Sequence, residues 1–195
     1  MRFTLILMAF FSLLVSCNDS NNSSAPAKPA DLSGIPAGAI QEPYSDNPNR
    51  IKVTLKNAQG DPVEQGDYLN GLRQGNWTIY SQGGAINSIT NYEQGVKEGL
   101  MIIADNSGQI TERAYYHNDL KNGLNVLYNR AKKSEEKSYV NGKLEGIVKK
   151  YYDNGKMMEQ SNYTNGVLNG IARWYDQEGN LTIEYEYDNG KLIKK

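Results

Sequence analysis

The sequence predicts an all-β fold: an elongated, twisted meander of antiparallel β-hairpins built from repeats of about 24 residues. Three observations predict it. A tyrosine recurs at an almost constant interval, glycines recur at fixed offsets from it, and all six prolines lie before residue 63. Because proline cannot donate to a β-ladder, the proline-free remainder suits one continuous sheet.

The recurring tyrosine defines the repeat. Its spacing is 24 residues except for one interval of 23, and the column comprises Tyr68, Tyr92, Tyr116, Tyr139, Tyr163 and Tyr187. Repeats therefore begin at 68, 92, 116, 139 and 163, with a partial repeat at 187. Tyr44 lies 24 residues before the first of them, so we assign 44–195 to the repeat domain and 44–67 to a degenerate cap.

Three glycine columns predict the turns. Glycine tolerates positive φ, so the third column, as in Asp153-Asn154-Gly155, predicts tight hairpin connections. The first two columns form an Asn-Gly-x-x-x-Gly pattern, as at 141–146, which we interpret as a wider return turn. Asp119 and Ala131 replace glycine in the third repeat, which is one residue short.

The segments between these turns are the expected strands. Trp77–Tyr80 and Ile171–Tyr175 are typical first strands of a unit, and Lys156–Tyr163 is a typical second strand. Two such strands and two turns fill a repeat without any helix. The pattern leaves open whether the sheet stays single-layered or curls upon itself.

The aromatic side chains have two interpretations. A tyrosine ring lying across a glycine of the neighbouring strand shields exposed backbone, which is a structural role. Alternatively, aromatics regularly spaced on a sheet can stack on sugar rings or hold side chains of a partner. The candidate binding surface comprises Trp77, Tyr80, Tyr128, Tyr151, Trp174 and Tyr175.

Residues 1–16 have the pattern of a secretory signal peptide. A positive charge at Arg2 is followed by an apolar stretch over 3–15, too short to span a bilayer as a helix. Leu14-Val15-Ser16 precede Cys17, which is the single cysteine of the chain. This arrangement resembles the lipobox of bacterial lipoproteins, which implies lipidation of Cys17 and anchoring to the membrane. Asn18, in place of aspartate, favours the outer membrane by the resemblance to enteric sorting signals.

Residues 17–43 combine the lipidated cysteine with a segment predicted to be a disordered tether. The segment is polar, contains several prolines and has few large apolar side chains. It cannot bury enough surface to offset the entropy lost on ordering. The tether would hold the repeat domain close to the membrane.

Composition and motifs argue against catalysis and against nucleic-acid binding. A net charge of −1 provides no basic field, and His117 is the single histidine, so a metal site of the usual nitrogen and sulfur ligands is not expected. No nucleotide or hydrolase motif occurs, so no cofactor is expected. Carboxylates recur on the second strands, where alternating charge predicts a solvated face, and a glycosidase-like carboxylate pair is a distant third interpretation. These carboxylates are Glu112, Glu135, Glu136, Glu159, Glu184 and Glu186.

The pattern Tyr-x-Asn-Gly-Lys-x-x-Gly-x-x-x-x-Tyr-Tyr-x-Asn-Gly-Lys at 139–156 resembles the MORN-repeat variant of bacterial proteins. Many of these proteins, the YwqK family, are labelled as antitoxins of toxin–antitoxin systems, frequently as lipoproteins. The resemblance implies hairpin units and a non-catalytic role as a protein-interaction scaffold in the cell envelope, with an envelope protein or a toxin as partner. The alternative is a surface that binds carbohydrate or peptidoglycan through the tyrosines and tryptophans.

Overall fold

A computed structural model describes residues 34–194 as a single antiparallel sheet, which confirms the all-β hairpin meander. Leu14, Val15, Ser16 and Cys17 lie outside the described residues. The strands are β1 (Ile40–Pro43), β2 (Arg50–Lys56), β3 (Pro62–Leu69), β4 (Leu72–Tyr80), β5 (Ile86–Glu93), β6 (Val96–Ala104), β7 (Ile110–His117), β8 (Leu120–Lys121), β9 (Gly123–Asn129), β10 (Lys132–Val140), β11 (Lys143–Leu144), β12 (Gly146–Tyr151), β13 (Met157–Thr164), β14 (Val167–Tyr175), β15 (Leu181–Asp188) and β16 (Lys191–Lys194).

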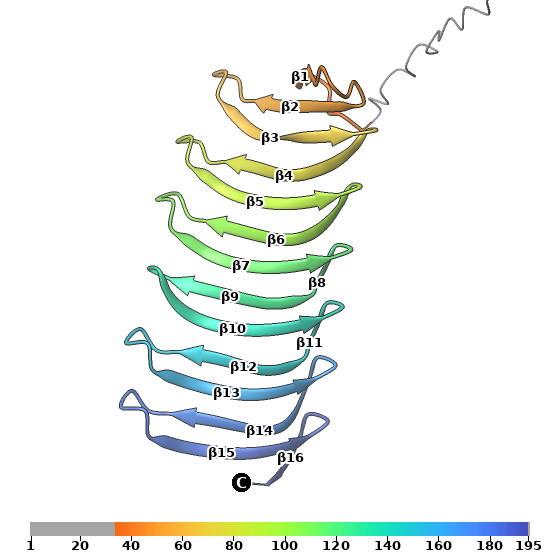
Figure 1. Ribbon diagram of the computed structural model, residues 1–195. Coiled ribbons are helices and arrows are strands. Elements are labelled where there is room, and N and C mark those ends of the chain that lie inside the picture. Colours follow the sequence, from red (N-terminus) through yellow and green to blue (C-terminus); the bar gives the residue numbers. More distant parts are fainter. Residues whose placement is uncertain (1–33, 195) are drawn as a thin grey trace, which may run out of the picture.

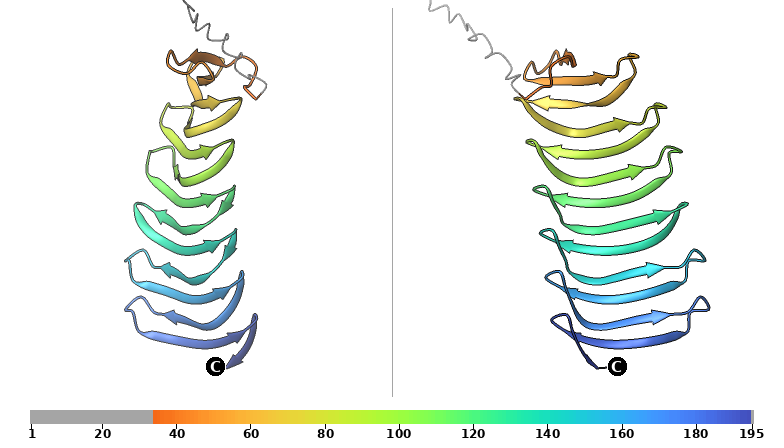
Figure 2. Two further views of the ribbon diagram at one scale, coloured as in Figure 1. Left: turned by 45° about the vertical axis from the view of Figure 1, so that its right-hand side comes forward. Right: turned by 180° about the vertical axis from the view of Figure 1, so that it is seen from behind.

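Strands that are consecutive in the chain are neighbours in the sheet, from β1 to β16 (Figure 1). The short strands β8 and β11 pair with β7 and β10 and continue directly into β9 and β12. The described strands form one open layer that does not close on itself, and each long strand is bent along its length (Figure 2). The sheet is therefore a long trough with one hairpin per repeat.

The two edges of the trough carry different turns. At the right edge in Figure 1, Asn141 and Gly142 form a two-residue turn with φ of 47° and 80°, as a type I′ hairpin requires. At the left edge, the amide of Gly179 donates to the carbonyl of Asp176 (3.0 Å), and Gly179 has a φ of 91°. This is the three-residue loop in which a type I turn is followed by a left-handed glycine.

The predicted wide return turn is therefore wrong. The Asn-Gly pair alone reverses the chain, and the second glycine, such as Gly146 with a φ of 82°, lies in the following strand instead. The strands are accordingly longer than expected: β14 begins at Val167, whereas the sequence pattern placed its start at Ile171. Left-handed residues inside a strand occur at bulges, which bend and twist it.

Repeats that lack a glycine keep the same backbone. Asp119 adopts a φ of 64° after Asn118, which is consistent with the tolerance of Asn and Asp for this region. In the shortened repeat, Arg130 and Ala131 form a two-residue turn with φ of 48° and 63°. The missing residue therefore converts one three-residue loop into a tighter turn without breaking the sheet.

The sheet begins earlier than residue 44. β1 (Ile40–Pro43) pairs with β2, and Ile35 and Ala39 pack against a buried cluster of Ile51, Val53, Tyr68 and Trp77. The predicted tether thus ends before residue 35, because its last residues carry apolar side chains that this cluster buries. Pro43 is tolerated since β1 is an edge strand.

A row of buried residues runs along one face of the sheet. Residues paired across strands share a face, and one row of them is at most 9% exposed. A single layer can bury such a row only if its strands bend toward it, so we call this the inner face and the opposite side the outer face. The inner row comprises Val53, Trp77, Thr90, Met101, Ala114, Asn125, Val148, Ser161 and Ala172.

Candidate functional site

The sheet divides the predicted aromatic surface between its two faces. Trp77 belongs to the inner row, and Trp174 lies two positions from Ala172, so both face inward. The other four members lie an odd number of positions from an inner-row residue and therefore face outward: Tyr80, Tyr128, Tyr151 and Tyr175. The six aromatics cannot act together as one ladder.

Trp77 is a core residue, being only 2% exposed. Its ring lies over Gly66, where an added Cβ would come within 2.4 Å of ring atoms. Edge-on contacts with Tyr68 (5.2 Å) and Tyr92 (6.5 Å) enclose it, and its indole nitrogen donates to the carbonyl of Asp67 (3.1 Å). An aromatic enclosed in this way cannot stack on a sugar, so the prediction of Trp77 as a binding residue is wrong. Gly66 belongs to none of the repeating columns, so the repeat pattern could not indicate this packing.

The repeating tyrosines pair with glycines of the preceding strand. Tyr92 lies opposite Gly75, Tyr163 lies opposite Gly146, and the same register recurs in the other repeats. The structural interpretation of this column is therefore supported. The glycine supplies a left-handed residue within the strand, and the tyrosine lies directly opposite it in the next strand.

The inner face also holds a series of ion pairs. Arg73 contacts Glu64 (2.6 Å), Lys121 contacts Glu112 (2.7 Å), and two further pairs, Lys137–Glu135 (2.7 Å) and Lys150–Glu159 (2.8 Å), follow along the trough. The four carboxylate side chains are only 15–19% exposed. For Glu112, Glu135 and Glu159 the predicted solvated face is therefore wrong. Each carboxylate is bound to a cation, an arrangement unlike a glycosidase pair.

The environment of Glu112 illustrates the electrostatics of this face. Burial alone would raise the pKa of its carboxyl group, but hydrogen bonds from Lys121 (2.7 Å) and Asn125 (2.6 Å) outweigh burial and lower the pKa below its ordinary value. Lys121 also lies over the ring of Tyr139, 5.6 Å from its centroid. The charged side chains of the trough therefore stabilise the packing between repeats.

Outward-facing tyrosines hold side chains of the neighbouring hairpin. The hydroxyl of Tyr151 donates to Glu136 (2.8 Å), and that of Tyr80 donates to Gln65 (3.4 Å). Burial and the bond to the Glu136 carboxylate raise the pKa of Tyr151 to about 12. These hydroxyl groups are thus engaged within the sheet.

His117 ends β7 on the outer face with its side chain 55% exposed, and its Nδ1 lies 3.0 Å from Glu98. Among residues 34–194, no group of His, Cys, Asp and Glu side chains is arranged to hold a metal ion. Nor does that part of the chain contain a helix long and apolar enough to cross a membrane.

The outer face carries an exposed apolar stripe near the Asn-Gly edge. Side chains alternate between the two faces along each strand, and counting from the inner row places the members of this stripe on the outer face. Each of them is 41–51% exposed. We define the outer apolar stripe as Tyr115, Leu120, Leu124, Val140, Ile147 and Val167. The sequence held a signal for part of it, because the residue directly after the second glycine is apolar in four repeats: Leu100, Leu124, Ile147 and Ile171.

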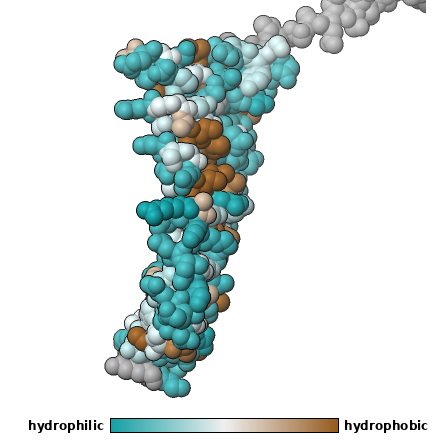
Figure 3. Space-filling model, turned by 90° about the vertical axis from the view of Figure 1, so that its left-hand side faces the viewer, coloured by the Kyte–Doolittle hydropathy of each residue, from teal (hydrophilic) through white to brown (hydrophobic). Residues whose placement is uncertain are grey.

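The opposite edge is largely hydrophilic. Seen from the side of the three-residue loops, polar side chains dominate, and apolar ones gather in the upper half (Figure 3). Ile79, Ile86 and Ile110 are each exposed by more than 40%. Grooves of similar volume separate several of these loops, with about 520 Å³ between loops 81–84 and 105–108.

The fold and its columns define the class: an open, single-layer β-hairpin repeat protein. Within it, residues 144–165 and 168–189 match the family model described as the MORN repeat variant. No curated protein matches the chain. The two matched segments are successive repeats that run from one Asn-Gly turn to the next. They indicate a repeat-based role in protein interaction.

Proposed function

We propose that this protein is a non-catalytic scaffold that binds a protein partner in the cell envelope through the outer apolar stripe. The exposure of the stripe is the observation that carries the proposal. Six large apolar side chains, each 41–51% exposed, lie on strands whose backbone hydrogen bonds are already made within the sheet. Exposed apolar side chains that gather on one face often mark interaction sites on soluble proteins.

The neighbours of the stripe favour a protein as its occupant. Leu124 and Ser138 are paired across β9 and β10, and Ile147 is paired with Asn162 across β12 and β13, so apolar and small polar side chains alternate. This mixture is typical of a protein interface, in which apolar anchors are accompanied by hydrogen-bonding groups. The rigid sheet presents these side chains without any cost of ordering a loop.

Binding is tested with the full-length protein as bait in a membrane extract. The Leu124→Glu/Ile147→Glu double variant places two charges in the stripe and should lose a stoichiometric partner. Gln160→Glu adds a charge to the same face outside the stripe and should retain it. Equal recovery of the partner by the double variant would show that the stripe is not the interface.

The envelope location rests on Cys17 and the Leu14-Val15-Ser16 sequence before it. We propose that Cys17 is lipidated and holds the protein at the membrane, with Asn18 favouring the outer membrane. Cys17→Ala should move the protein from the membrane fraction to the soluble fraction. Membrane retention of this variant would contradict the anchor.

An antitoxin-like role is one form of this scaffold, in which the partner is a toxin that meets the protein in the envelope. The MORN-type match supports a repeat-based scaffold for protein interaction. The carbohydrate-binding alternative, in its predicted form, used the aromatic ladder and loses Trp77 to the core. A catalytic role has no support from the inner carboxylates, each of which is bound to a lysine or arginine.

A further inference from the structure

The edge opposite the outer apolar stripe carries a row of grooves between successive three-residue loops. The first has a volume of about 510 Å³ and lies between loops 57–61 and 81–85; the second has about 520 Å³ and lies between loops 81–85 and 105–109. A third groove of about 530 Å³ recurs between loops 152–156 and 176–180. All three grooves are open to solvent along the edge.

The three grooves share an unusual chemistry. Each is lined by at least one tyrosine and at least two side-chain amides, and none is lined by lysine or arginine. The first two grooves share Tyr80 and Gln82, so they form a continuous track along the edge. The shortened turn at Arg130–Ala131 interrupts the row and brings the positively charged Arg130 to this edge.

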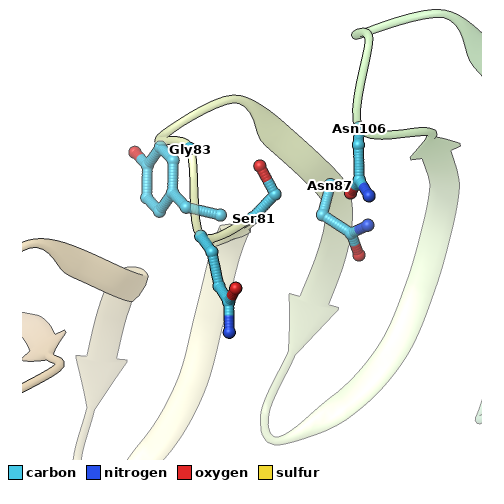
Figure 4. A pocket seen from close by; sticks show the side chains of 6 residues that line it. Ser81, Gly83, Asn87 and Asn106 are labelled. Atoms are coloured by element: carbon cyan, nitrogen blue, oxygen red, sulfur yellow. The ribbon is translucent and has the colours of Figure 1, made fainter.

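Amide groups in the second groove have free hydrogen-bonding capacity. Asn87 donates to the carbonyl of Ala104 (3.3 Å), which fixes its amide and leaves its oxygen as an oriented acceptor. Between residues 34 and 194, the side chains of Gln82 and Asn106 have no hydrogen-bond partner. Figure 4 shows Asn87 and Asn106 on one side of this groove, with Ser81 and Gly83 of the hairpin loop on the other.

We propose that this loop edge binds a neutral, β-linked polysaccharide, with successive disaccharides lying in successive grooves. Planar amides pair well with the neighbouring hydroxyl groups of a sugar, and a tyrosine ring packs against its apolar face. Successive repeats are two strands apart, or about 10 Å. That distance is close to one disaccharide of an extended β-1,4-linked chain.

The same observations disfavour other ligands. A polyanion, including nucleic acid, binds lysine and arginine, and none lines the grooves. An apolar peptide segment needs apolar pockets, whereas Val63 is the one aliphatic side chain among the lining residues. This surface is distinct from the outer apolar stripe, and its occupancy is independent of the proposed protein partner.

Isothermal titration calorimetry with the full-length protein tests the proposal. The probes are tetra-N-acetylchitotetraose, its disaccharide, cellotetraose and, as an acidic comparison, tetragalacturonate. We expect a neutral tetrasaccharide to bind with a dissociation constant below about 1 mM and at least roughly tenfold more tightly than the disaccharide, because it spans two grooves. Absence of binding by both neutral tetrasaccharides, or preference for tetragalacturonate, would overturn the proposal.

The location is tested with Gln82→Ala/Asn106→Ala. Both positions are exposed loop residues without internal hydrogen bonds, so circular dichroism should be unchanged. Each lost hydrogen bond weakens binding about fivefold, so the double variant should bind about 25-fold less tightly. Gln41→Ala removes an exposed amide from β1 and should bind like the wild type. Unchanged affinity of the double variant, or loss of affinity in Gln41→Ala, would refute the assignment of the ligand to this edge.

Discussion

Replacing Gly66 with alanine should destabilise the N-terminal repeats. The added Cβ would lie 2.4 Å from two ring atoms of Trp77 and 2.7 Å from a third. Ordinary contacts begin about 1 Å further away. Gly66 is not in the left-handed region, so the effect arises from packing and not from backbone strain.

The magnitude follows from how tightly the indole of Trp77 is held. Tyr68 and Tyr92 contact its edges, Arg73 lies 4.3 Å from its ring centroid, and its nitrogen bonds to Asp67. Overpacking of a filled core costs about 1–3 kcal/mol, and displacing the indole hydrogen bond costs about 1 kcal/mol. Alanine also lowers the conformational entropy of the unfolded chain, which stabilises the folded state by about 0.5 kcal/mol. We therefore expect Gly66→Ala to lower the free energy of unfolding by about 1.5–3.5 kcal/mol.

Urea denaturation followed by far-ultraviolet circular dichroism measures this change. Gly83→Ala is the matched control: it too has an ordinary φ, and its added Cβ would meet nothing within 4 Å. It should change stability by less than about 0.5 kcal/mol. In a Trp77→Leu background the Gly66→Ala penalty should largely disappear, because the clashing ring is gone. Equal penalties in both backgrounds, or equal effects of the two glycine variants, would refute the reasoning.

Three further predictions concern single contacts. Gly146→Ala should cost about 1–2 kcal/mol because alanine is strained at a φ of 82°, whereas Gly146→Asn should cost less; equal costs in denaturation experiments would contradict this. The lowered pKa of Glu112 means that its ionised form stabilises the fold above the unfolded pKa of about 4.5. The stability difference between wild type and Glu112→Gln should therefore shrink as the pH falls below that value. A difference that does not depend on pH would contradict this prediction. The raised pKa of Tyr151 means that its protonated hydroxyl stabilises the fold below pH 10 and that this contribution disappears between about pH 10 and 12. In thermal melting, Tyr151→Phe should therefore be less stable than wild type at pH 7 and equal to it at pH 12. A stability difference that persists at pH 12 would argue against the bond to Glu136.

The repeat columns were sufficient to predict the fold because each column has a local physical cause. The Asn-Gly pairs occupy positive φ in two-residue turns, and the third glycine closes the three-residue loops. The second glycine was misassigned to a turn, since a left-handed residue within a strand leaves the same sequence pattern as one within a loop. Its pairing with the tyrosine column shows that it lies within a strand.

The candidate site was less predictable because the face to which a side chain points depends on β-bulges as well as on the alternation of side chains along a strand. Trp77 and Tyr80 are both aromatic and lie near the middle of a unit, yet they are three positions apart in β4 and therefore point to opposite faces. The inner carboxylates were misassigned because a bent single layer buries one face without a second layer. No sequence periodicity distinguishes such a trough from a flat sheet with two solvated faces.

The residues that can specify function are those that lie between the repeating tyrosine and glycine positions. The tyrosine and the second glycine of the repeat are paired across neighbouring strands, so their roles are structural. The outer apolar stripe and the amides of the loop grooves lie between those columns and at opposite ends of the strands. Along β12, Ile147 of the stripe lies four positions, or about 13 Å, from Tyr151 of the third groove, so the two surfaces are separate. A scaffold that joins an envelope protein to a glycan would need this separation, and a longer array would extend both surfaces without changing either.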